Sequence, residues 1–221
     1  MSGGAPARLS RAERREITRQ RLLDAAAEVF TDHGFDGAAI DDVAARAGYT
    51  RGAFYSNFAG KPELLVALSE QRLQRFLGEL VPVLRDTPDG ERIARAAEFL
   101  SDRGSQDVLL LIELARLRGA TPEVDALLDG FARDLTALVV RELQDPSFDL
   151  GDPSPAQLEE GARAFVGAVL GVTLLTHLGV GERRRTAELL LEGALRAAFP
   201  DAPYLEGTAP GPLPTSSELT S

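Results

Sequence analysis

The chain has 221 residues, 44% of them hydrophobic, and it contains no cysteine. This composition is typical of a globular protein with room for one small and one medium-sized domain. The lack of cysteine excludes disulfides, thiolate nucleophiles and cysteine-ligated zinc, and it favours a reducing, cytoplasmic location.

The formal net charge of −10 is unevenly distributed. Residues 1–63 contain nine basic and nine acidic residues, so the acidic excess of ten lies in residues 64–221. Residues 1–21 hold six arginines against two glutamates. We expect residues 1–10 to form a flexible basic arm that can contact phosphate groups, with a solvated terminus as the alternative.

Helical periodicity begins near Arg11 and runs to about His33, with Gly34 as the expected stop. A second, shorter apolar stripe recurs every three or four residues, at Ile40, Val43, Ala44 and Ala47. Gly48 then ends this segment, because glycine adopts the left-handed conformation without a Cβ penalty. Thr50 follows with a hydroxyl that can cap the next helix, so a tight turn is expected in place of a loop.

The segment after this turn has one apolar face and one exposed face. Phe54 and Phe58, four residues apart, anchor the apolar face. The residues that point away from them are Arg51, Gly52, Tyr55, Ser56 and Asn57. Gly52 costs about 1 kcal/mol of helix propensity relative to alanine, and its missing side chain would let a sugar-phosphate strand come close. Two short helices with this turn and this face are typical of a helix-turn-helix that reads DNA.

The residues around this motif resemble the N-terminal domain of the TetR family of transcription regulators. The resemblance covers residues 11–68 without a gap in its spacing. It rests on Arg21, Leu22, Leu23, Asp24, Ala25, Ala26, Phe30, Gly34, Phe35, Val43, Ala44, Ala47, Gly48, Thr50, Arg51, Gly52, Phe54, Tyr55, Phe58, Lys61, Leu64 and Leu65. It implies an all-helical homodimer with a three-helix DNA-binding domain and a larger helical domain that binds a small molecule and dimerises.

The same resemblance implies which residues touch DNA. They are Thr50, Arg51, Gly52, Tyr55, Ser56, Asn57 and Lys61. We expect phosphate contacts from Thr50 and Lys61 and base contacts from the others with side chains; Lys61 precedes a proline at a helix start, where free N–H groups favour a phosphate. Ala38 and Ala39 occupy positions where the family usually has hydroxyl residues, so that helix cap and its phosphate contact are not expected here.

The expected fold class is therefore all-α, with about nine helices. The proposed divisions are the basic arm at 1–10, a helix-turn-helix DNA-binding domain at 11–61, an effector-binding and dimerisation domain at 62–199, and a disordered tail at 200–221 rich in proline, glycine, serine and threonine. Helices of the larger domain are expected at residues 62–84, 91–102, 106–118, 122–143, 155–178 and 182–199.

The last two of these helices are the candidates for a dimer interface. Residues 164–181 form the longest uncharged stretch, which we interpret as a buried dimer helix and not as a membrane span. Small and apolar residues that would allow two subunits to approach closely are Gly167, Gly171, Leu190, Ala194 and Ala197. Packing within one subunit is the alternative explanation for these residues.

A pocket for a small-molecule effector is expected between the helices of the larger domain. The candidate lining residues are Phe99, Leu110, Glu113, Leu114, Phe131, Leu135, Phe165 and His177. Plain core packing is the alternative for the apolar members, an intrahelical pair with Arg116 is the alternative for Glu113, and an interface position is the alternative for His177.

These sequence features are best explained by a ligand-responsive DNA-binding regulator. We expect a repressor that binds a palindromic operator as a dimer and is released by a small, largely apolar effector. No cofactor or metal is expected. An effector-independent architectural DNA-binding protein is the alternative. An enzyme of the helical domain is a further one, but the sequence has only two histidines and lacks a nucleophile elbow, a P-loop and a dinucleotide fingerprint.

Overall fold

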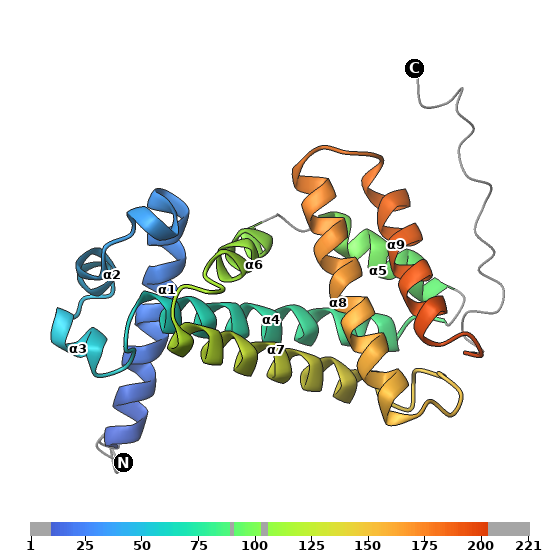
Figure 1. The fold of residues 1–221 in the computed structure, drawn as a ribbon, viewed down its shortest axis with the longest axis horizontal. Coiled ribbons are helices and arrows are strands. Elements are labelled where there is room, and N and C mark those ends of the chain that lie inside the picture. Colours follow the sequence, from blue (N-terminus) through green and yellow to red (C-terminus); the bar gives the residue numbers. More distant parts are fainter. Residues whose placement is uncertain (1–9, 89–90, 103–105, 203–221) are drawn as a thin grey trace, which may run out of the picture. The chain divides into compact units, whose positions relative to one another are not determined.

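The computed structural model describes residues 10–88, 91–102 and 106–202 (Figure 1). Within these ranges it contains nine α-helices and no β-strand, which confirms the all-α class. The helices are α1 (Arg11–Gly37), α2 (Ile40–Arg46), α3 (Arg51–Tyr55), α4 (Lys61–Arg85), α5 (Arg92–Asp102), α6 (Gln106–Arg116), α7 (Pro122–Leu143), α8 (Pro155–His177) and α9 (Arg183–Ala198).

These helices form two compact units. One comprises Met1–Arg72 and Leu109–Phe131, and the other comprises Leu73–Val108 and Ala132–Ser221, so α4, α6 and α7 contribute residues to both. In the part of the chain that the structure describes, no helix is long and apolar enough to cross a membrane. The expected basic arm and disordered tail lie outside the described residues, apart from Ser10 and residues 200–202.

The first unit is organised by α1. Ser10 and Glu13 form a capping box at its start, in which each side chain accepts a hydrogen bond from the other residue's backbone N–H. The expected stop at Gly34 is a break in the helix with φ 68°, after which one short turn continues to Gly37. The helix α2 lies against both α1 and α3. Fully buried side chains from all three helices include Leu22, Val29, Val43 and Phe54.

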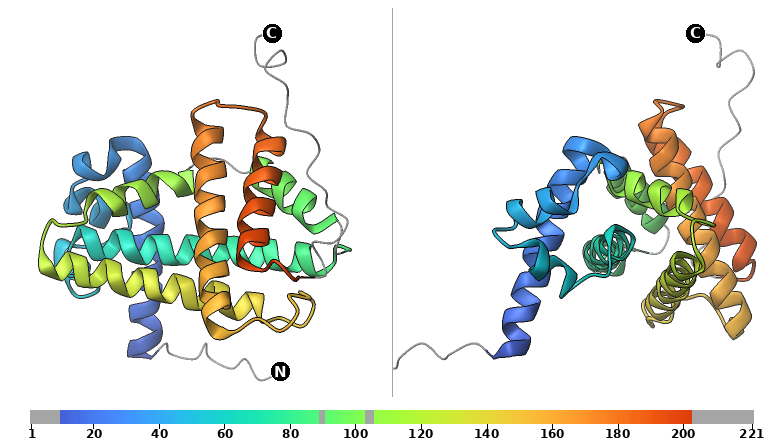
Figure 2. Two further views of the ribbon diagram at one scale, coloured as in Figure 1. Left: turned by 45° about the vertical axis from the view of Figure 1, so that its right-hand side comes forward. Right: turned by 60° about the vertical axis from the view of Figure 1, so that its left-hand side comes forward.

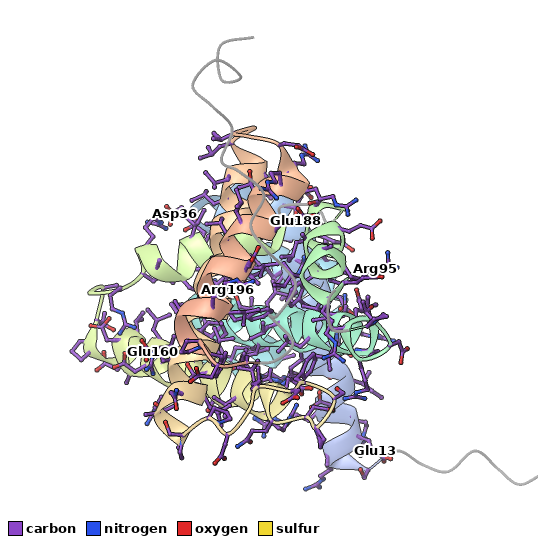
Figure 3. The ribbon with its side chains drawn as sticks, turned by 90° about the vertical axis from the view of Figure 1, so that its right-hand side faces the viewer. Glu13, Asp36, Arg95, Glu160, Glu188 and Arg196 are labelled. Atoms are coloured by element: carbon purple, nitrogen blue, oxygen red, sulfur yellow. The ribbon has the colours of Figure 1, made fainter. Side chains whose placement is uncertain are left out.

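The second unit is built around α8 and α9, which run antiparallel and side by side (Figures 1 and 2). Close approach near the start of α8 depends on Gly161, because a Cβ there would lie 2.2 Å from Cζ of Phe199. The helix α5 packs on α9. Figure 3 looks onto these two helices, with Glu188 and Arg196 on α9 and Arg95 on α5.

Several helix starts follow the local signals in the sequence. Thr121 accepts a hydrogen bond from the N–H of Val124 at 3.3 Å and so caps α7, as expected from threonine followed by proline. At α8, Ser154 and Gln157 form a second capping box around Pro155, the first helical residue. Residues 144–154 contain no helix, which agrees with the expected gap between the helices at 122–143 and 155–178.

Candidate nucleic-acid interface and effector cavity

A tight turn joins α2 to α3. Gly48 has φ 77°, a conformation that an L side chain would strain, and a Cβ there would meet nothing within 4 Å. Backbone hydrogen bonds from Gly48 to Ala45 (3.0 Å) and from Tyr49 to Ala44 (2.8 Å) close the turn. Thr50 then caps α3 by accepting a hydrogen bond from the N–H of Ala53 at 3.3 Å. Backbone conformation, and not crowding, is therefore the reason for glycine here.

The two faces of α3 differ as the sequence predicts. Phe54 is fully buried, and its ring lies 5.8 Å from that of Phe58. On the other face Tyr55 keeps 47% of its surface exposed, and Arg51 is exposed as well. Because Arg51 and Tyr55 both lie on the surface, this face of α3 is accessible to a partner.

Arg51 is held in place by two neighbours. Its Nη1 donates to Oδ2 of Asp41 at 3.0 Å, and its Nη2 lies 3.5 Å from the hydroxyl of Tyr55. The guanidinium carbon lies 5.6 Å from the centre of the Tyr55 ring. The hydrogen bond to Tyr55 and the charge of Asp41 both raise the pKa of Arg51. An arginine and a tyrosine thus form one fixed, exposed pair.

Gly52 and Ser56 lie beside this pair. A Cβ at Gly52 would meet only Oγ1 of Thr50, at 3.7 Å, and the residue does not have a positive φ. Neither packing nor backbone conformation within the described chain therefore requires glycine at this position. Ser56 is exposed, and its hydroxyl donates to the carbonyl oxygen of Gly52 at 3.0 Å.

Asn57 faces the protein more than the other predicted contact residues do. Its side chain is half-buried, and its Nδ2 donates to the carbonyl oxygen of Ala53 at 2.8 Å. Its Oδ1 is buried and has no hydrogen-bond partner among the residues that the structure describes. Its backbone carbonyl accepts from Arg19, whose guanidinium lies 4.4 Å from the centre of the Phe58 ring. Asn57 therefore joins the end of α3 to α1.

Lys61, the first residue of α4, points back towards the end of α1. Its Nζ donates to the carbonyl oxygens of Phe35 (2.8 Å), Asp36 (3.2 Å) and Ala38 (2.9 Å). An ammonium group has three N–H donors, so these three acceptors saturate it. A phosphate contact by Lys61 would require one of these hydrogen bonds to break.

The comparisons with known proteins agree with this geometry. Residues 22–68, which include all of α2 and α3, match the family model for bacterial regulatory proteins of the tetR family. The chain belongs to the TetR family of transcription regulators. This is a family of DNA-binding helix-turn-helix regulators and not a class of enzymes.

Two curated relatives are similar over part of their length. The HTH-type transcriptional activator FasR of Mycolicibacterium smegmatis is 33% identical over 135 residues, which are 54% of this chain and 61% of FasR. The A-factor receptor protein of Streptomyces griseus is 36% identical over 177 residues, which are 78% of this chain and 60% of the receptor. The chain therefore spans less than two thirds of the length of these relatives.

A solved structure is similar over a larger share of the chain. SmeT, the repressor of the Stenotrophomonas maltophilia multidrug efflux pump SmeDEF, is 26% identical. The similarity covers 90% of this chain and 100% of SmeT, with a TM-score of 0.54. A SmeT–triclosan complex is 27% identical, with a TM-score of 0.55, and the similarity covers 89% of this chain and 99% of SmeT.

The second unit of this TetR-family chain contains a cavity of about 70 Å³. Its wall is apolar except for Arg92 and Glu142. The lining residues are Leu77, Leu80, Val81 and Leu84 of α4; Arg92, Ile93 and Ala96 of α5; Val139, Glu142 and Leu143 of α7; Phe148 and Leu150; Phe165 of α8; and Leu191 and Leu195 of α9.

Arg92 is a buried cation in this wall, with 7% of its surface exposed. Its Nε donates to the carbonyl oxygens of Leu84 (3.0 Å) and Thr87 (3.1 Å), at the end of α4. Its guanidinium also lies 5.1 Å from the centre of the Phe148 ring. Arg92 therefore fastens the start of α5 to the end of α4 and to the loop before α8.

Of the eight residues predicted to bind an effector, Phe165 lines this cavity. Phe99 and Leu135 pack in the second unit's core instead, Phe99 with its ring 5.9 Å from that of Phe76. The side chain of His177 is exposed at the end of α8. Three further predicted residues belong to the first unit and do not line the cavity: Leu110, Leu114 and Phe131. Glu113 belongs there too and forms the intrahelical pair with Arg116, at 2.8 Å.

The predicted dimer residues divide into outward-facing and inward-facing positions. Gly167 and Ala197 are exposed, and a Cβ at Gly167 would meet nothing within 4 Å. Gly171 faces α9 within the same chain, because its Cβ would lie 3.5 Å from Cδ1 of Leu190. Leu190 and Ala194 are half-buried against the same core. Packing within one subunit therefore accounts for Gly171, Leu190 and Ala194, and the dimer interface stays a prediction for the exposed Gly167 and Ala197.

Sequence reasoning missed Asp41, Asp36 and Arg92. From the sequence, Asp41 is expected to be a solvated carboxylate at a helix start. The turn between α2 and α3 instead brings it into contact with Arg51, ten positions further along the chain. Asp36 carries two roles, since its carbonyl accepts from Lys61 and its carboxylate pairs with Arg116 at 2.6 Å. Arg92 follows a turn signal, and nothing in the local pattern distinguishes it from an exposed arginine.

Proposed function

We propose that this protein is a dimeric, ligand-responsive regulator that represses transcription from a palindromic operator and is released by a small, largely apolar effector. The observation that carries the proposal is the exposed pair of Arg51 and Tyr55, which α3 holds above the buried Phe54. Side chains of this kind on a short helix after a tight turn fit the major groove of DNA.

Within the recognition helix, Arg51, Tyr55 and Ser56 are the residues that contact bases. Thr50 and the backbone at Gly52 approach the phosphates. The open space at Gly52 supports this role, because no side chain of the described chain fills that space. Asn57 and Lys61 support the recognition helix from its protein side. They hold the end of α3 and the start of α4 against α1 through the hydrogen bonds described above.

The proposed functional division keeps residues 11–61 as the DNA-binding domain and residues 62–199 as the effector-binding and dimerisation domain. A dimer formed through the outer face of α8 and α9 would present two symmetry-related copies of α3, and this two-fold symmetry is the reason to expect a palindromic operator. The exposed Gly167 and Ala197 support this face. A DNA partner also implies a cytoplasmic protein.

The effector site is proposed at the cavity behind Phe165. A cavity of about 70 Å³ is smaller than the roughly 150 Å³ that accommodates benzene, so an effector would have to widen it. The apolar wall favours a compound with few polar groups. Names of relatives support a ligand-bound regulator: one is a receptor for A-factor, and SmeT is a repressor that forms a complex with triclosan.

Coupling between effector and DNA would run along α4. This helix supplies Leu77, Leu80 and Leu84 to the cavity wall, and its first residue is Lys61. An effector that widens the cavity displaces the lining part of α4, and the hydrogen bonds of Lys61 transmit that displacement to the end of α1. Effector binding then favours a state in which both half-sites cannot be bound together.

Selection of bound sequences from random duplex DNA, at about physiological salt, tests the proposal. The expected result is an enriched palindrome, and hydrophobic compounds that stabilise the protein in a thermal-shift assay should then release it. A folded protein that enriches no sequence would contradict the DNA proposal. An enriched palindrome that no stabilising compound releases would favour the effector-independent architectural protein instead.

A further inference from the structure

The contact between Asp41 and Arg51 joins the two helices of the helix-turn-helix on their exposed side. Asp41 lies in the first turn of α2, and Arg51 is the first residue of α3. Their side chains are 61% and 60% exposed, and the distance between Nη1 and Oδ2 is 3.0 Å. Because exposed ion pairs contribute little to stability, the fold does not depend on this contact.

What the contact does fix is the orientation of the guanidinium. An arginine side chain in water samples many rotamers, and a planar guanidinium can offer a base two parallel N–H donors only in one orientation. Here Nη1 is held by Asp41, Nη2 lies near the Tyr55 hydroxyl, and the Tyr55 ring lies 5.6 Å from the guanidinium carbon. These contacts leave N–H donors of the same plane for a partner outside the protein.

The carboxylate also has an electrostatic cost for DNA binding. A negative charge beside the recognition helix repels phosphates, so it lowers affinity for every sequence alike. The Asp41 carboxylate favours binding only where the oriented Arg51 meets its correct base.

We propose that Asp41 is a positioning residue for Arg51, which sharpens base selection at the position that Arg51 contacts while it lowers affinity for DNA in general. This inference rests on the proposed function, because it needs α3 to read bases. It assigns a specificity role to a residue of α2 that does not itself touch a base.

Asp42 offers a matched control. It follows Asp41 in the same first turn, its side chain is exposed, and no hydrogen bond or ion pair joins it to Arg51 in the described part of the chain. Asp41→Asn and Asp42→Asn each remove one negative charge from the start of α2. Their circular dichroism and melting temperatures show whether both variants fold alike.

The experiment measures the dissociation constants of wild type, Asp41→Asn and Asp42→Asn for the selected operator and for duplexes with single base changes in each half-site. Arg51→Ala first identifies the base position that depends on Arg51. Asp41→Asn is expected to reduce the preference at that position roughly fivefold or more and to leave other positions unchanged. Asp42→Asn should keep the preference, while both raise affinity for unrelated DNA to a similar extent.

A double variant separates positioning from a general change of charge. In an Arg51→Ala background, adding Asp41→Asn should cause no further loss of base preference. Asp41→Asn that keeps the wild-type preference, or that loses it equally in both backgrounds, overturns the inference while the proposed function stands. A wild type without any base preference overturns the proposed function and this inference together.

Discussion

Lys61 donates a hydrogen bond of 2.8 Å to the carbonyl oxygen of Phe35, and its ammonium lies 4.9 Å from the centre of the same residue's ring. Phe35 follows directly after the break at Gly34. The first residue of α4 therefore holds the corner at which α1 ends and the chain turns towards α2.

Replacing Lys61 by methionine should lower the free energy of unfolding by about 1–3 kcal/mol, since the hydrogen bonds to three carbonyl oxygens are lost. Urea unfolding of wild type, Lys61→Met and a control variant measures the effect. Arg15→Met is the control, because it removes an exposed cation from α1 and should change stability by less than about 0.5 kcal/mol. Equal effects in the two variants would show that the contacts of Lys61 carry no stability.

A side chain at Gly161, near the start of α8, should lower the stability of the protein. In Gly161→Ala the new Cβ would overlap the Phe199 ring, and overpacking of this kind costs about 1–3 kcal/mol. Gly78→Ala is the matched control within the same unit. Its Cβ would meet nothing within 4 Å on an exposed face of α4, so it should gain about 0.5–1 kcal/mol through helix propensity. Destabilisation by both substitutions would contradict the close contact.

The part of the site that the sequence predicts is the part that depends on neighbouring residues. Gly48 predicts a turn and Thr50 predicts a helix cap from residues only a few positions away, and both predictions are confirmed. Lys61 shows the limit of such reasoning. The phosphate contact stays a prediction, and the local pattern does not reveal the carbonyl acceptors of Lys61, which lie more than twenty residues away in the sequence.

The same limit explains the effector residues. Helical spacing identifies Phe99 and Phe165 as apolar positions of their helices, but it cannot tell a cavity wall from a close-packed core. That difference depends on how well side chains from five helices fill the space between them. The need for glycine at Gly161 is equally hidden, since it depends on a ring thirty-eight positions further along the chain.

Acid should weaken the first unit through Asp32. Its hydrogen bond from Arg46, at 2.7 Å, holds the pKa of Asp32 below its usual value. A carboxyl group whose pKa is lower in the folded state adds stability above the unfolded pKa of about 3.9, and it loses that contribution as the pH falls through the folded pKa. Unfolding free energies measured from pH 6 down to about pH 3 should therefore fall less steeply in Asp32→Asn than in wild type. Asp24→Asn, on the same helix, is the control because Asp24 accepts from Gln20 and not from a cation; a wild-type slope in Asp32→Asn would contradict the prediction.

Filling the cavity should separate effector response from DNA binding. Ala96 is buried in the cavity wall, and leucine at this position would occupy the space that an effector needs. We expect Ala96→Leu to bind the operator as wild type does but to need at least about tenfold more effector for release. Ala94→Leu, on the same helix and outside the lining, should respond normally. An unchanged response in Ala96→Leu would place the effector site elsewhere.

The exposed face of α3 is proposed to read DNA. The most direct test is the ratio of dissociation constants for the selected operator and a scrambled duplex, measured for wild type, Arg51→Ala and Tyr55→Ala. Arg95→Ala serves as the control, since Arg95 is an exposed arginine on α5 (Figure 3). The expected result is a preference that falls about tenfold or more in both α3 variants, with light scattering showing the same dimer and Arg95→Ala behaving as wild type. A preference that survives in both α3 variants would contradict the claim.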